Sequence, residues 1–198
     1  MSKIQHQIVT QGFEVIKTKI AAILVDELSS QYSMGNDQAL NVSEIFVDRI
    51  TPINHTECPV VNVCFADNEY IRATQISQNV VSIFHIDFYT VSKNSLTNNS
   101  DKLSARNLSR LMHVVQNILM HPVYNRLELS GIENVNVKKM SVADPLNTQD
   151  ANSMQLGRLI VEVKNDGKCT MNDLGEIIEG VTSVVKAEGG KFKFVYAS

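Results

Sequence analysis

The residues best placed for proton chemistry are His85 and Asp87, which lie two apart in a run of alternating apolar side chains. Side chains two apart on a strand point to the same side, so the carboxylate could orient the imidazole as a general base. No Ser or Cys nucleophile can be assigned beside them from the sequence. Val81, Ile83 and Tyr89 share that face, which favours a polar pair on a partly solvated sheet face or in a subunit contact.

A metal site is the second possible chemistry, because His55, Cys58 and Cys64 lie close in sequence and His85 could sit on a neighbouring strand. Zinc requires ligands that converge tetrahedrally, and this spacing is irregular. Free cysteine is commonly a small buried hydrophobe, so packing is the favoured interpretation and no metal or cofactor is expected. The three cysteines, which include Cys169, cannot all pair within one chain and indicate a reducing compartment.

Arg106 and Arg110 lie one helical turn apart and could bind an anion, although a solvated helix face is the commoner meaning of such a pair. Sequence-specific nucleic-acid binding is disfavoured because the formal net charge is −3 and the pI is about 5.9. No glycine-rich phosphate loop or dinucleotide fingerprint is present, which argues against an enzyme of those classes.

The length of 198 residues and the hydrophobic fraction of 43% predict a single domain over 1–198 with a sizeable core. The longest apolar run, residues 20–25, is far shorter than the roughly 20 residues that span a bilayer. The first residues do not form a signal peptide, so we expect synthesis in the cytoplasm and no membrane partner.

Two amphipathic helices are predicted from apolar residues at three- and four-residue spacing, at residues 4–29 and about 101–120. Strands are predicted at residues 43–50, 59–66, 75–91, 134–142 and 155–163, with turns at 51–54, 67–69 and 165–167. The segments 92–100 and 144–154 read as polar loops, either plain surface loops or arms that become ordered on a partner.

The last part of the chain is less determined by its pattern. Residues 172–187 fit either a helix or a strand, and residues 191–197 are predicted to be a final strand. Since strands and helices do not alternate regularly, the expected class is α+β, with a mainly antiparallel sheet packed against two helices. The core spans 43–165, and 166–198 form a C-terminal extension of uncertain topology.

This layout resembles the tail terminator, or tail completion, proteins of long-tailed bacteriophages and prophages. The resemblance is one of architecture over about residues 5–165: a helix, a Pro-led strand from Pro59 to Phe65, a long strand over 80–91, an Asp-started helix over 101–119, and a last strand over 156–163. It implies a virion structural protein without enzymatic activity or cofactor. It also implies a ring-shaped homo-oligomer, usually a hexamer, whose partners are the tail tube protein and the head connector or head-closure protein.

The family role implied is to cap the tail tube, end its polymerisation and join the tail to the head, in the host cytoplasm during assembly and then in the virion tail. Subunit contacts are expected on the mixed face of strand 80–91 and on the exposed stripe of the second helix. The candidates are His85, Asp87, Tyr89, Arg106 and Arg110. The alternatives are another neck, head-closure or minor tail component, a small-molecule-binding α+β module, and an enzyme built on scattered His85, Asp87 and Cys64.

Overall fold

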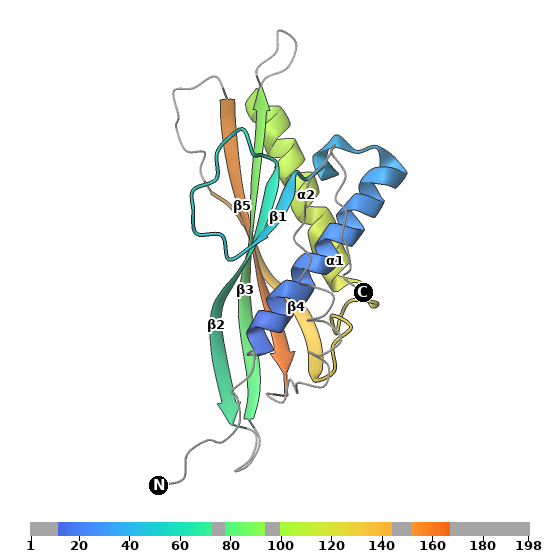
Figure 1. Ribbon diagram of the computed structural model, residues 1–198, viewed down its shortest axis with the longest axis vertical. Coiled ribbons are helices and arrows are strands. Elements are labelled where there is room, and N and C mark those ends of the chain that lie inside the picture. Colours follow the sequence, from blue (N-terminus) through green and yellow to red (C-terminus); the bar gives the residue numbers. More distant parts are fainter. Residues whose placement is uncertain (1–11, 73–77, 94–99, 144–151, 167–198) are drawn as a thin grey trace, which may run out of the picture.

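A five-stranded mixed sheet with two helices on one side forms the body of the protein in the computed structural model (Figure 1). The structure describes residues 12–72, 78–93, 100–143 and 152–166. The expected α+β class is therefore confirmed. The predicted final strand at 191–197 and the open segment 172–187 lie outside the described residues.

The sheet has the order β1-β2-β3-β5-β4. Its strands are β1 (Glu44–Val47), β2 (Val60–Arg72), β3 (Gln78–Lys93), β4 (Ile132–Val142) and β5 (Asn152–Asn165). All neighbours pair antiparallel except β1 and β2, which are parallel. The parallel pair was not anticipated, because strand direction depends on how residues 48–59 carry the chain back to the start of β2.

Helix α1 (Gly12–Gly35) packs on β1 and β2, and α2 (Ser100–Met120) packs on β3, β5 and β4. Both helices lie on the same side of the sheet (Figure 1). The short 3-10 helix η1 (Gln38–Leu40) joins α1 to β1 and also contacts α2. The sheet thus has one covered face and one face that no described helix covers, which we call the open face.

The core lies between the two helices and the covered face. Strand residues alternate, so every second side chain points to the helices and is almost fully buried. These core strand residues are Val61, Val63, Phe84, Ile86, Phe88, Leu159, Val161 and Val163. The predicted apolar stripe of the second helix meets them, and its predicted polar stripe, which includes Arg106 and Arg110, is exposed.

Gly157 marks the closest approach between the helix layer and the sheet. A Cβ atom at this position would clash with Met112 Sδ and lie 3.1 Å from Leu108 Cδ1. Any side chain at this point of β5 would therefore force the ends of the Met112 and Leu108 side chains to shift. Near the start of α2, the buried hydroxyls of Thr90 and Ser104 lie 3.2 Å apart and fix the helix to β3.

Several predicted boundaries are wrong. The first helix does not end at residue 29 but continues to Gly35, where the predicted break does occur. Residues 67–69 are not a turn: they continue β2 past a β-bulge between Phe65 and Asp67. Strand β4 begins two residues early at Ile132, and β5 begins at Asn152, inside the predicted loop 144–154. Cross-strand pairing extends these strands beyond the limits that their apolar pattern suggested.

Candidate interaction surface

The open face is built from the alternate residues of β2, β3 and β5. Its half-buried members are Cys64, Ile83, His85, Tyr89, Leu156 and Ile160. The sequence prediction that one side of the long strand is packed and the other partly solvated is confirmed by this difference in burial. A face of mixed polar and apolar side chains with intermediate exposure is suited to contact with another chain.

The centre of the open face is an ion pair between Asp87 on β3 and Arg158 on β5. These residues are direct cross-strand partners, and Asn62 on β2 lies opposite Asp87 on the other side. The guanidinium of Arg158 donates through Nε to Asp87 Oδ1 at 2.5 Å and through a terminal nitrogen to Oδ2 at 2.8 Å. The Asp87 side chain is 8% exposed and that of Arg158 is 44% exposed. The carboxylate is therefore buried in the sheet, and solvent reaches the guanidinium.

His85 lies one pair along the same face, opposite Cys64 on β2 and Ile160 on β5. Burial, and then the positive charge of Arg158, lower the pKa of His85, so the neutral imidazole is favoured. Burial also raises the pKa of the Cys64 thiol, which favours the protonated form over the nucleophilic thiolate. The arrangement favours neutral side chains around one internally neutralised ion pair.

Tyr89 completes this group at the next position toward the start of β2, opposite Val60 and Leu156. Burial raises the pKa of its phenol further above neutral pH. The structure therefore brings three of the five predicted contact residues onto one continuous surface: His85, Asp87 and Tyr89.

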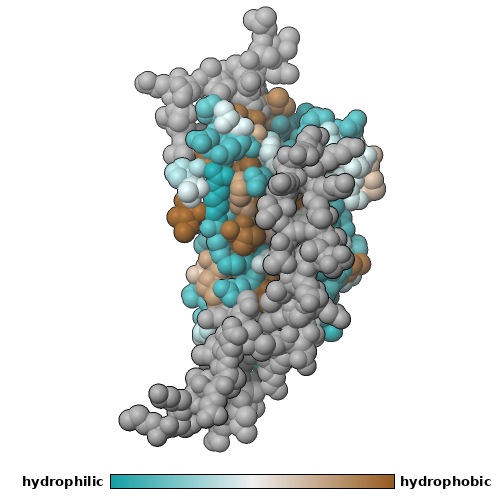
Figure 2. Space-filling model, viewed as in Figure 1, coloured by the Kyte–Doolittle hydropathy of each residue, from teal (hydrophilic) through white to brown (hydrophobic). Residues whose placement is uncertain are grey.

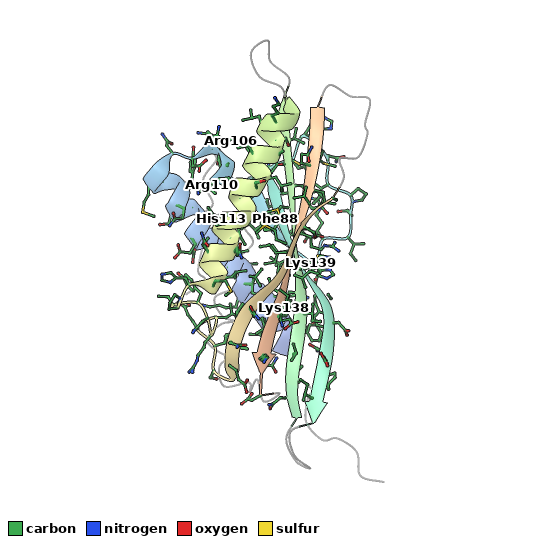
Figure 3. All side chains as sticks on the ribbon, turned by 180° about the vertical axis from the view of Figure 1, so that it is seen from behind. Phe88, Arg106, Arg110, His113, Lys138 and Lys139 are labelled. Atoms are coloured by element: carbon green, nitrogen blue, oxygen red, sulfur yellow. The ribbon has the colours of Figure 1, made fainter. Side chains whose placement is uncertain are left out.

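The other two predicted contact residues lie elsewhere. Arg106 and Arg110 follow one another along the outer surface of α2, on the opposite side of the sheet from Asp87, and His113 continues the row (Figure 3). Arg110 Nε donates to Asp37 Oδ2 at 2.9 Å, and this hydrogen bond lowers the pKa of the Asp37 carboxyl. The five candidates therefore form two separate surfaces.

The boundary of the open face on the β1 side is formed by residues 48–57. The Asn62 side chain accepts from Arg49 N at 3.1 Å and donates to Arg49 O at 3.0 Å, which fixes this segment to β2. The Arg49 guanidinium lies 4.3 Å from the Phe46 ring and pairs with Glu57 at 2.7 Å. Ile50, in the same segment, is 96% exposed.

The possible metal ligands do not assemble. Cys58 and Cys64 are both free thiols, and burial raises the pKa of Cys58 to about 11. Within the described ranges, no group of three or more His, Cys, Asp or Glu residues is arranged to hold a metal ion. In the same part of the chain, no helix has the length and hydropathy needed to cross a membrane.

Sequence reasoning missed Arg158 as the partner of Asp87. The two residues are 71 positions apart, and only the register of β3 against β5 brings them together. Sequence reasoning also missed the outer edge of β4, where Met140 is 42% and Val142 is 55% exposed. The alternating pattern of β4 was visible, but nothing in it showed that this strand ends the sheet.

On the face drawn in Figure 2, the apolar side chains of the described residues are dispersed. Figure 2 shows small brown areas separated by teal ones on the face in view, rather than one large hydrophobic patch. Dispersed apolar residues of this kind are usual on a protein surface.

No protein-family model matches the chain, and no curated protein matches it in sequence. Among solved structures, it is similar to a chain described as the virion of a native gene transfer agent particle. That similarity has a TM-score of 0.40 and 11% sequence identity, and it covers 70% of this chain and 91% of the other. Similarity at this level is a partial resemblance between the two backbone folds.

Proposed function

We propose that this protein is a virion structural protein that caps a phage tail tube, ends its polymerisation and provides the surface to which the head is joined. The proposed form is a homo-oligomeric ring, with six subunits as in the family that the sequence resembles. It acts in the host cytoplasm during assembly and then in the virion tail, and its role requires no catalytic group.

The observation that supports this proposal is the one-sided construction of the sheet. Two helices cover one face, while the open face presents half-buried Tyr89, His85 and Ile160 around the Asp87–Arg158 pair. A ring subunit must touch two neighbours and also the tube beneath it, so it requires several separate contact surfaces. The open face and the exposed stripe of α2 supply two such surfaces on opposite sides of the sheet.

The direct test is co-assembly with tail-tube subunits of the same phage or prophage. Solution mass and negative-stain images first establish whether the protein alone forms a closed ring. The protein is then added below stoichiometry to growing tubes, and tube lengths are measured. We expect shorter tubes with the protein at one end. Tubes of unchanged length, with no protein at their ends, would refute the proposal.

Variants on the two surfaces sharpen this test. Tyr89→Ala alters the open face, and Arg106→Glu alters the stripe on α2, so each reports on one side of the sheet. Tyr70→Ala is the matched control, because it removes a tyrosine that is 59% exposed near the other end of β2. We expect at least one surface variant to lose ring formation or tube capping while the control retains both.

A further inference from the structure

The two halves of the described structure, one on the β1 side of the sheet and one on the β4 side, differ in formal charge. Residues 12–72, which contain α1, η1, β1 and β2, have nine acidic against four basic side chains, a formal net charge of −5. Residues 100–142 together with β5 have eight basic against four acidic side chains, a formal net charge of +4. The central strand β3 has one of each and is neutral.

Across the sheet, this separation in sequence is also a separation in space, whereas in the helix layer the two halves meet where Arg110 pairs with Asp37. The sheet order places β1 and β4 at opposite ends, with α1 over the acidic end and α2 over the basic end. Five strands at about 4.8 Å spacing set the two edges roughly 19 Å apart, about two Debye lengths at physiological ionic strength. The view from behind shows Arg106, Arg110 and His113 on α2 together with Lys138 and Lys139 on β4 (Figure 3).

Each edge also carries apolar side chains on its covered face. Met140 and Val142 of β4 lie opposite Leu159 and Gly157, so they project to the helix side, where they are 42% and 55% exposed. Val47 of β1 lies opposite Val63, also on the helix side, and is 38% exposed.

The open-face residues at the two edges have opposite charge. Lys139 lies opposite Ile160, and Glu44 lies opposite Val60, so both project to the open face, and both are exposed. Lysine on an edge strand ordinarily discourages strand pairing with another chain. An acidic partner edge removes that obstacle and makes the pairing selective.

We infer that the β4 edge of one copy of this chain binds the β1 edge of the next copy, head to tail, so that the sheet continues from subunit to subunit. The occupant of the edge is a second copy, because the complementary charge and the matching apolar residues are on this same chain. The inference rests on the proposed ring-forming function and specifies its subunit contact. Since the two edges are different surfaces, such association closes into a ring when its rotation permits.

Strand direction is compatible with this contact. Strand β1 is parallel to β2, and three successive antiparallel pairings separate β2 from β4, so β1 and β4 run in opposite directions. A neighbour rotated about an axis along the strands keeps its direction, and its β1 therefore meets β4 antiparallel. The helix-covered faces of the two copies then lie on the same side of the continuous sheet. On that side, Met140 and Val142 of one copy lie beside Val47 of the next, and on the open face Lys139 of one copy is on the same side as Glu44 of the next.

Charge reversal tests the contact. Lys139→Glu and Glu44→Lys each replace an attraction with a repulsion, and we expect each to weaken self-association by about tenfold. The double variant Lys139→Glu/Glu44→Lys should return to within about twofold of the wild type. Lys164→Glu is the control, since it makes the same change in charge at an exposed position on β5, away from the edge. Association is measured by sedimentation velocity over a concentration series.

Disulfide trapping locates the contact directly. In a background with its native cysteines replaced by alanine, a Val47→Cys copy is mixed with a Met140→Cys copy and oxidised. We expect a cross-linked dimer from the mixture, and little from Met140→Cys mixed with Ser109→Cys, whose cysteine lies on the exposed surface of α2.

The outcomes separate the two proposals. A wild-type ring that is insensitive to both reversals and forms no 47–140 cross-link overturns this contact and leaves the tube-capping function standing. A wild type that is monomeric at every concentration and forms no cross-link also overturns the contact. The same result is expected if another segment of the chain covers the edge of β4. Trapped 47–140 dimers without any effect on tube length would support the contact and count against the proposed function.

Discussion

Removing Arg158 should destabilise the protein more than removing the charge of its partner, Asp87. The pair is asymmetric, because the Asp87 side chain is 8% exposed whereas that of Arg158 is 44% exposed. Arg158→Met leaves a carboxylate within the sheet, and Asp87→Asn leaves a guanidinium that water can reach. Loss of one partner of a fully buried ion pair costs about 3–5 kcal/mol.

The expected cost is smaller here, because solvent can reach the Arg158 side of the pair. We expect about 2 kcal/mol for Arg158→Met and about 1 kcal/mol for Asp87→Asn. The double variant should cost about 1.5 kcal/mol, half of the sum, because it leaves neither charge unpaired.

The assay is urea unfolding followed by far-UV circular dichroism, at one fixed low protein concentration so that self-association does not differ between variants. A control is Lys164→Met, which removes an exposed charge on the same strand and should change the free energy of unfolding by less than about 0.5 kcal/mol. The reasoning is refuted if the two single variants cost the same and their effects simply add.

Three further effects are expected. Gly157→Ala should lower the free energy of unfolding by about 1–3 kcal/mol, because the new methyl meets Met112. Met112→Ala in the same chain should make the effect of Gly157→Ala smaller. Additive costs in urea unfolding would contradict this. The Tyr124 hydroxyl donates to Glu27 Oε1 at 2.5 Å, and this hydrogen bond raises the pKa of Tyr124 to about 12. Tyr124→Phe removes the bond, and thermal unfolding should show that the free energy of unfolding is lower by about 0.5–1 kcal/mol. Burial lowers the pKa of His85 below 6.5, so as the pH decreases the unfolded chain binds this proton before the folded chain does. The free energy of unfolding should therefore decrease as the pH is lowered through about 6.5, and this decrease should be smaller in His85→Gln. Identical pH profiles for the two proteins would refute this.

Local patterns in the sequence were sufficient for much of the fold. Apolar residues at three- and four-residue spacing identified α2 almost to the residue, since a helix that packs on a sheet must bury one continuous stripe. The apolar run over 75–91 predicted the strand β3, and Phe84, Ile86 and Phe88, which share one of its faces, are in the core. Alternation along the strand assigned His85, Asp87 and Tyr89 to the other face, because side chains on a strand repeat every two residues.

Non-local pairing decided the rest. The polar residues 67–69 look like a turn in isolation, and they form part of β2 only because β3 lies alongside and accepts the bulge after Phe65. The direction of β1, the partner of Asp87 and the position of β4 at the end of the sheet all depend on which strands meet. Cross-strand hydrogen bonds join residues far apart along the chain, and a linear pattern contains no record of that register.

The surfaces divide in the same way. The sequence alone determined that Arg106 and Arg110 lie on a polar helix stripe and that His85 and Asp87 share a strand face. Only the tertiary structure set these two groups on opposite sides of one sheet, and placed the acidic half of the chain on the β1 side and the basic half on the β4 side. The physical reason is that burial of apolar side chains acts through local periodicity, whereas the position of a charge on the surface follows from the order in which the strands assemble.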